Sequence, residues 1–205
     1  MSQPRELFLS DLVFPECPRW RDGELWLSDV FGRKVLRVSE DGEPETVVDM
    51  PGRPSGLGFL PDGRLLAISQ EDAKVYVLNS DGLAVYADVG ELGKGPPNDL
   101  VITKSGRAYL SPFGFDMYGG EAPSLANLLA IETDGTVREV ATEMLFPNGM
   151  VISPDESTLI VAETGGGRLS AFDIEGDGGL TNRRAFAELD GASPDGICQI
   201  GRAHV

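Results

Sequence analysis

Short apolar segments recur along the whole chain, and Asp-Gly or Ser-Gly pairs separate many of them. The segments are rich in β-branched and aromatic residues, a composition typical of β-strands joined by tight turns. No stretch places apolar residues at the three- and four-residue spacing of an amphipathic helix. The pattern therefore predicts an all-β fold.

Two short units alternate along the chain. A turn followed by a strand occurs at residues 22–28, 62–68, 105–111 and 155–161. A strand followed by a turn comes after each of them, at residues 34–38, 74–78, 128–131 and 168–172. With one further apolar segment before the first unit and one after the second, each repeat contains four strands in roughly 40–50 residues.

A four-stranded repeat of this length predicts a β-propeller blade. A β-sandwich also has many short strands, but it has no fixed four-strand internal unit. Four repeats are complete, and a fifth starts at Asp195. We therefore expect four complete blades and the first strand of a fifth.

Polar residues stand where the first strand of a repeat begins. They are Glu16, Asn98, Asn148 and Asp195, while Ser55 occupies this position in the second repeat. Each alone has an ordinary explanation as a turn residue or a solvated acid. Equivalent positions of neighbouring blades converge on the propeller axis, so together the four would face one channel mouth.

Two carboxylates and two amide carbonyls would make an all-oxygen cluster at this mouth. Oxygen ligands suit Ca²⁺, Mg²⁺ or Mn²⁺, whereas a zinc finger needs nitrogen or sulfur donors. Carboxylates that converge without a cation would repel each other.

The composition of the chain argues against several classes of binding partner and of catalytic site. A formal net charge of −16 opposes binding to nucleic acid or to an anionic membrane surface. The single histidine, His204, argues against Ser-His-Asp and Cys-His hydrolysis. Two cysteines make no disulfide framework, and no signal-peptide or membrane-spanning pattern is present, so we expect a cytoplasmic protein.

Other residues are expected to be structural. Trp20 and Trp26 are predicted core residues, and Cys17 and Cys198 are predicted to be small buried side chains. The glycines at 165–167 favour a hairpin over a phosphate loop, because no helix follows them. The insert at residues 114–124 is expected to form a loop over the channel mouth, where it is a candidate specificity element.

Several stretches together resemble the gluconolactonase family, also called the senescence marker protein, regucalcin and luciferin-regenerating enzyme family. The resemblance runs from about Val13 to Cys198. It depends on five stretches that occur together in a fixed order and spacing, at residues 14–20, 98–100, 146–150, 181–184 and 194–198. It implies a six-bladed propeller with one divalent cation at its axis, calcium foremost, with magnesium, manganese or zinc as alternatives.

The resemblance also implies roles for the polar residues. Glu16, Asn148 and Asp195 match the family's metal ligands, and Asn98 matches a residue that contacts substrate or metal-bound water. The implied activity is metal-dependent hydrolysis of a sugar lactone or a related small lactone or ester, with Asp195 also serving as general base. A propeller that binds calcium or another ligand without catalysis is the alternative.

One position departs from the family pattern. Sugar-lactone members often carry an arginine two residues before the substrate asparagine, and Pro96 stands there in this chain. The contact to a sugar hydroxyl would be missing, which favours a less polar lactone.

The last residues of the chain do not continue the fifth repeat. We interpret residues 1–198 as one propeller fragment and residues 199–205 as a non-native tail that matches a translated sequencing adapter. A degenerate natural C-terminus is the alternative. In both cases an open ring exposes strand edges, so we expect the 205-residue chain itself to fold poorly and to have little activity.

Overall fold

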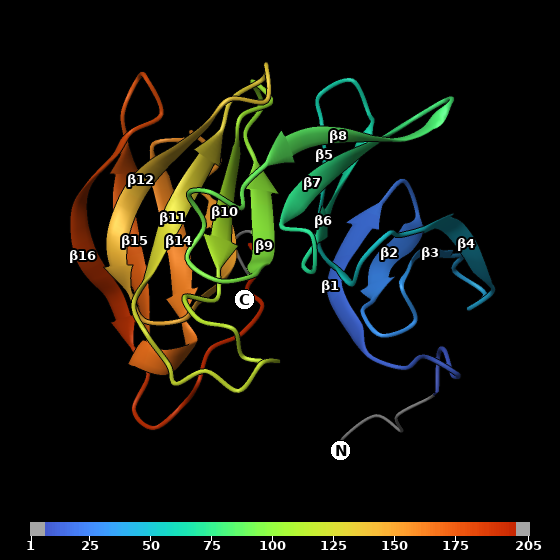
Figure 1. Cartoon of the computed structure of the whole chain (residues 1–205), viewed down its shortest axis with the longest axis horizontal. Helices are drawn as coiled ribbons and strands as arrows, with labels where there is room; N and C mark the ends of the chain where they lie inside the picture. The colour runs from blue at the N-terminus through green and yellow to red at the C-terminus, as the bar shows by residue number, and fades with distance from the viewer. Residues whose placement is uncertain (1–6, 200–205) are drawn as a thin grey trace, which may run out of the picture.

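The structure, a computed structural model, describes residues 7–199. In this range it is built of β-strands apart from one short 3₁₀ turn at Thr164–Gly166. The strands form four separate four-stranded antiparallel sheets, in each of which the strands follow one another in chain order (Figure 1). The predicted all-β fold with four complete blades is confirmed.

Each sheet corresponds to one sequence repeat. The first contains β1 (Pro15–Arg21), β2 (Glu24–Asp29), β3 (Lys34–Val38) and β4 (Pro44–Asp49). The second contains β5 (Pro54–Phe59), β6 (Leu65–Ser69), β7 (Lys74–Asn79) and β8 (Gly82–Asp88). The third contains β9 (Pro97–Ile102), β10 (Ala108–Pro112), β11 (Ala126–Ile131) and β12 (Val137–Met144). The fourth contains β13 (Pro147–Ile152), β14 (Thr158–Glu163), β15 (Arg168–Ile174) and β16 (Leu180–Glu188).

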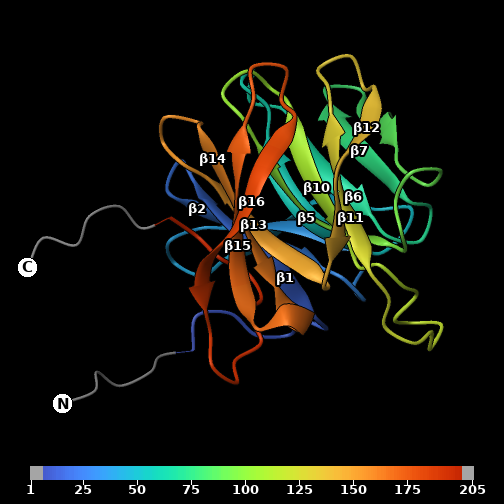
Figure 2. The same cartoon turned by 90° about the vertical axis from the view of Figure 1, so that its left-hand side faces the viewer.

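The first strand of each sheet lies innermost. β5 contacts β1 on one side and β9 on the other, and β9 also contacts β13. β4 and β16 lie at the two outer sides of the view in Figure 1, and Figure 2 shows the same sheets after a quarter turn. β1 and β9 both run upward in Figure 1, so their first residues lie at its lower end, where the yellow-green segment after β10 also lies.

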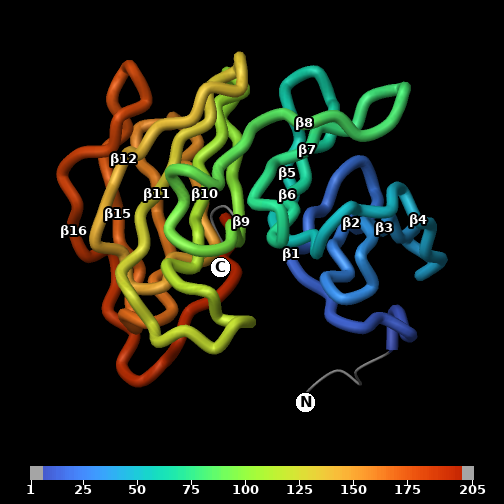
Figure 3. The backbone as a smooth tube through the Cα atoms, in the orientation of Figure 1, coloured from blue at the N-terminus to red at the C-terminus, as the bar shows by residue number. Residues whose placement is uncertain are grey.

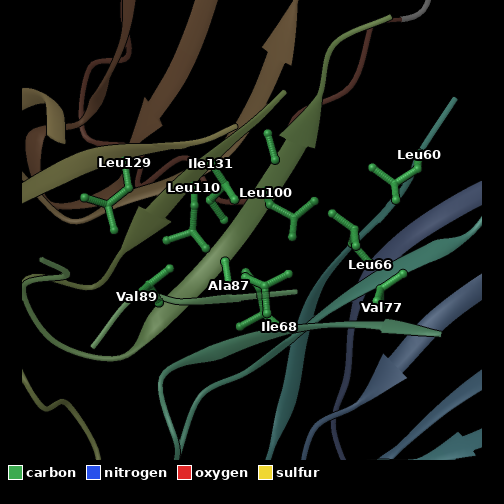
Figure 4. Close-up of a cluster of buried hydrophobic side chains, with 12 residues drawn as sticks. Leu60, Leu66, Ile68, Val77, Ala87, Val89, Leu100, Leu110, Leu129 and Ile131 are labelled. Carbon is green, nitrogen blue, oxygen red and sulfur yellow. The ribbon is translucent and has the colours of Figure 1, made fainter. Parts of the chain in front are cut away.

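The hydrophobic core lies between the sheets. One cluster joins the second and third sheets through Ile68 and Val77 on one side and Leu100, Leu110 and Ile131 on the other (Figure 4). Equivalent clusters join the third sheet to the fourth and the first sheet to the second. Burial of these apolar faces is what holds neighbouring blades together, since the sheets share no strand ladder.

Each innermost strand contains one extra residue near its start. From Glu16 to Arg19, β1 advances by three positions while its partner β2 advances by two. The same irregularity lies between Pro54 and Leu57 in β5, between Pro147 and Met150 in β13, and at Asn98 in β9. A β-bulge of this kind turns a side chain out of the regular alternation. The bulges coincide with the polar positions singled out in the sequence.

Glu163, at the end of β14, is fully buried and binds two arginines. Its carboxylate accepts hydrogen bonds from Arg168 Nε at 3.0 Å, from Arg183 Nη2 at 2.9 and 3.0 Å, and from the Leu145 N–H at 2.8 Å. The hydroxyl of Ser170 also donates to it. Arg183 in addition donates to the carbonyls of Thr142 and Glu143 in β12, so the cluster links the third and fourth sheets.

Three sequence predictions are wrong. Trp20 is 63% exposed, because it lines an open cavity, whereas Trp26 packs against the cluster between the first and second sheets. Cys198 is exposed, while Cys17 is buried as expected. No strand forms at Asp195 within the described residues, where the segment after β16 makes only one backbone hydrogen bond to β13, from the Gly149 N–H to the Asp195 carbonyl at 3.2 Å.

Three further expectations concern the glycines at 165–167, the C-terminal residues and membrane-spanning segments. Gly165 and Gly166 belong to the 3₁₀ turn and Gly167 follows it, so the three glycines form the hairpin connection between β14 and β15 as predicted. The interpretation of residues 199–205 as a non-native tail stays a prediction, since all of them except Gln199 lie outside the described residues. Within the part of the chain that the structure describes, no helix has the length and apolar character needed to cross a membrane.

Candidate active site

The four predicted site residues come from three different sheets and the segment that follows the last one. Glu16 lies in β1, Asn98 in β9 and Asn148 in β13, while Asp195 lies after β16. This last segment, red in Figure 3, returns from β16 toward the middle of the molecule. Glu16, Asn148 and Asp195 line one cavity of about 690 Å³.

Asn98 joins this group through Asn148. Its side-chain Nδ2 donates to Asn148 Oδ1 at 3.1 Å, and Asn148 Nδ2 donates to Thr164 Oγ1 at 3.2 Å. The Thr164 hydroxyl in turn donates to the Pro194 carbonyl at 2.6 Å, next to Asp195. A chain of hydrogen bonds therefore fixes both amides and the backbone that carries Asp195.

The two carboxylates act on each other electrostatically. Burial raises the pKa of Glu16, the negative charge of Asp195 raises it further, and only the hydrogen bond from the Cys17 N–H, at 3.3 Å, lowers it. No lysine or arginine forms an ion pair with either carboxylate among residues 7–199. Neither of these two carboxylates therefore has a positive side chain to balance its charge.

Ser111 connects β9 and β13, the strands that carry Asn98 and Asn148. Its hydroxyl lies 3.0 Å from the Asn148 carbonyl and 3.3 Å from the Asp99 carbonyl, and it accepts a hydrogen bond from the Asp99 N–H. Ser111 is fully buried, at the end of β10. It therefore ties the bulged start of β9 to that of β13.

An ion pair that the sequence analysis missed crosses the same cavity. Arg19 Nη2 donates to Asp99 Oδ1 at 2.7 Å and to the Leu100 carbonyl at 3.2 Å, which links β1 to β9 past β5. Asp99 is buried, and burial raises its pKa although Arg19 and the Leu100 N–H lower it. The sequence holds a signal for the pair, because Arg19 and Asp99 adjoin two predicted site positions, three residues after Glu16 and one after Asn98.

The residues present fit a hard divalent cation. Glu16, Asp195, Asn98 and Asn148 offer only oxygen atoms that can bind a metal, and the unbalanced carboxylates would gain from a positive charge between them. Among the described residues, no group of three or more histidine, cysteine, aspartate or glutamate side chains is placed to hold a metal. A cation here would rely on amide oxygens beside two carboxylates, a set that suits calcium or magnesium better than zinc.

The insert between β10 and β11 is a loop, as expected. Its first residues lie on the segment that leads to Asn98, where the Phe113 N–H donates to the Pro96 carbonyl at 2.9 Å and the Gly114 N–H donates to the Lys94 carbonyl at 2.6 Å. Gly95 has a φ of +80° and lies so close to Phe115 that a Cβ atom would approach the Phe115 N–H within 2.6 Å. The loop is therefore built against the strand start that carries Asn98.

Known proteins resemble this chain in sequence and in fold. Residues 14–199 match the family model described as SMP-30/gluconolactonase/LRE-like region. A lactonase drp35 from Staphylococcus haemolyticus is 27% identical over 206 residues, which cover 94% of this chain and 60% of that protein. The drp35 lactonase of Staphylococcus epidermidis is 26% identical over 192 residues, with 57% of its length covered. The chain thus spans less than two thirds of these curated relatives.

A solved structure shows the same fold. A gluconolactonase from Xanthomonas campestris superimposes with a TM-score of 0.77 at 27% identity, covering 93% of this chain and 68% of the other.

Proposed function

Because the chain belongs to the SMP-30/gluconolactonase/LRE-like family, we propose that it is part of a metal-dependent hydrolase of lactones or related small esters. The observation that carries the proposal is the convergence of Glu16, Asn148 and Asp195 on one cavity from separate parts of the fold. The lactonase and gluconolactonase relatives support the reaction class.

Glu16, Asn148 and Asp195 would hold the cation, with calcium as the expected ion. A divalent cation held there would polarise the ester carbonyl and lower the pKa of a water molecule. Asp195 is exposed at the cavity and would accept a proton from the attacking water. The second Nδ2 hydrogen of Asn98 is not used by Asn148 and would donate to the substrate carbonyl oxygen as its negative charge develops.

A test of the reaction class uses the full-length protein that contains this chain. We expect it to hydrolyse members of a panel of γ- and δ-lactones and phenyl esters, to lose this activity after chelation with EDTA, and to regain it with added Ca²⁺. Proton release in weakly buffered solution measures the reaction. Full activity after exhaustive chelation would contradict metal dependence, and no turnover of any substrate would contradict the enzyme assignment.

A protein that binds a cation or ligand without catalysis is the second candidate, because an oxygen-only donor set serves cation binding equally well. Calorimetry distinguishes the two. Tight calcium binding in the absence of any turnover across the panel would favour the binding protein.

Thr164 is expected to position the site without touching substrate. Thr164→Val removes the hydroxyl that accepts from Asn148 and donates to Pro194, so we expect calcium affinity to fall by about tenfold. Thr164→Ser keeps the hydroxyl and should bind calcium as the wild type does. Titration calorimetry measures both, and equal affinity of the valine variant and the wild type would show that this hydrogen-bond chain does not support the site.

Two further features of the protein stay proposals. The length of the matched structure supports a six-bladed ring in the full-length protein. This chain covers 68% of the Xanthomonas campestris gluconolactonase, which is close to the share that four blades make of a six-bladed ring. A cytoplasmic location is supported by the two free thiols, Cys17 and Cys198.

A further inference from the structure

Four charged side chains line the cavity that holds the candidate ligands. Glu16 and Arg19 lie in β1, Asp99 lies in β9, and Asp195 lies in the segment after β16. Within the described range, 7–199, no other charged side chain lines this cavity. Three carboxylates and one guanidinium leave it a formal charge of −2. A divalent cation is the ion that neutralises such a cavity.

Asp99 is the carboxylate whose charge is balanced. Its Oδ1 accepts a hydrogen bond from Arg19 Nη2 at 2.7 Å and a second from the Leu100 N–H at 2.8 Å. The side chain of Asp99 is only 7% exposed, so water contributes little to its solvation. A buried carboxylate needs a paired charge and hydrogen bonds to stay ionised, and Arg19 supplies both. The pair therefore adds no net charge to the cavity, and Glu16 and Asp195 account for the whole of it.

The pair lies close enough to the candidate ligands to act on them. Burial and the charge of Asp195 raise the pKa of Glu16 most, and the charge of Asp99 raises it as well. The buried thiol of Cys17, next to Glu16, responds to the same groups. Burial and the charge of Asp99 raise its pKa, the charge of Arg19 lowers it, and the charge of Glu16 raises it. Both members of the pair therefore contribute to the electrostatic potential at the start of β1.

An unbalanced Asp99 would change the charge of the cavity. Its negative charge would join those of Glu16 and Asp195 and give a formal charge of −3. The Coulomb energy grows in proportion to the charge of the bound ion, so a third negative charge favours a trivalent ion more than a divalent one. An unpaired Arg19 would act in the opposite sense and leave a charge of −1. The charge that an ion meets thus depends on both members of the pair.

We propose that the Arg19–Asp99 pair holds the charge of the cavity at −2 and thereby matches the site to a divalent cation instead of a trivalent one. The inference rests on the cation site of the proposed function but not on the hydrolytic reaction. A pair that only tied β1 to β9 would make a different prediction, because loss of either partner would then weaken the binding of every cation in the same sense.

The test measures the affinities of Ca²⁺ and La³⁺ for the full-length protein by titration calorimetry and compares their ratio among variants. Arg19→Gln should shift the ratio toward La³⁺ by about tenfold, because Asp99 keeps its hydrogen bond from the Leu100 N–H while its charge is no longer balanced. Asp99→Asn should shift the ratio toward Ca²⁺ by a similar factor. The double variant Arg19→Gln/Asp99→Asn has the wild-type charge in the cavity and should return the ratio to the wild-type value.

Two further variants separate the local charge from other effects. Arg19→Lys keeps the positive charge and should keep the wild-type ratio. Arg37→Gln is the matched control, because Arg37 lies on β3 of the same sheet, outside the cavity, and its loss changes the net charge of the protein equally. It should leave the ratio unchanged. Each single variant gives the sign of its own shift, so the test stands if one of them fails to fold.

Opposite shifts in the two single variants, with recovery in the double variant, would support the inference even if no lactone were hydrolysed, an outcome that refutes only the proposed reaction. Shifts in the same direction, or a double variant that departs from the wild type as far as the single variants do, would overturn it. An Arg37→Gln shift as large as that of Arg19→Gln would also overturn it, since net charge alone would then explain the result. Failure of the wild type to bind either ion would overturn the cation site and this inference together.

Discussion

Glu163→Gln is expected to lower the free energy of unfolding of the full-length protein by about 3 kcal/mol at pH 7, because it leaves two arginines beside a buried site without their negative partner. The variant also weakens the contact of Arg183 with β12, so the third and fourth sheets should separate more easily. Urea unfolding monitored by circular dichroism measures the effect. Glu188→Gln is the matched control, since Glu188 is exposed in the same sheet.

The difference between wild type and Glu163→Gln should depend on pH. Burial alone would raise the pKa of Glu163, but the hydrogen bonds from Arg168, Ser170, the Leu145 N–H and Arg183 outweigh it and hold the pKa below its ordinary value of 4.5. A carboxyl with a lowered pKa contributes its stability fully above pH 4.5 and loses it as the pH falls through the folded-state value. The two proteins should therefore converge in stability as the pH falls below 4.5 and through the folded-state pKa of Glu163. A constant difference from pH 7 to pH 3 would contradict the ion-pair explanation.

Asp195→Asn and Glu16→Gln are each expected to weaken calcium binding by on the order of 100-fold or more, since loss of a direct ligand exceeds the tenfold to 100-fold effect of a supporting residue. Removing one carboxylate also removes the mutual repulsion that a cation would relieve. Lactone hydrolysis should fall at least in parallel. Calorimetry and initial rates measure the two effects.

Asp190→Asn controls for a change of charge in the segment that carries Asp195. Asp190 is exposed and belongs to the same connection after β16. It should leave both calcium affinity and hydrolysis unchanged. If Asp195→Asn behaved like Asp190→Asn, Asp195 would be neither ligand nor base.

Most of the fold could be predicted from the chain because its signals are local. The Asp-Gly turns and apolar segments repeat with a near-constant spacing, and β3 coincides with the predicted strand at 34–38. The same spacing identified Glu16, Asn98 and Asn148 as equivalent positions, and the structure gives each of them a place at the start of an innermost strand.

The remaining features depend on contacts between residues that are distant in sequence. Arg19 pairs with Asp99 because the first and third sheets face the same cavity, and the sequence signals this pair only indirectly, through the place of each residue beside a predicted site position. Trp20 is apolar, yet it is 63% exposed, because it lines an open cavity and does not lie between two packed sheets, and the pattern of its own strand does not report this position. The extra residue at the start of each innermost strand is likewise invisible in a pattern of apolar and polar positions, because a bulge adds one residue without changing residue type.

Glu16 and Asn148 sit on sheets that share no strand ladder, and Asp195 lies outside the sheets, held to β13 by one backbone hydrogen bond. An ion bound by Glu16, Asn148 and Asp195 would therefore fasten β1, β13 and the last segment together, and only the assembled arrangement would bind it. Free calcium at about 100 times the dissociation constant would add roughly 2.7 kcal/mol to the stability of that assembly. The calcium level around the protein would then decide its lifetime as well as its activity, and depletion of the ion would expose the chain to proteases before any of its four sheets had melted.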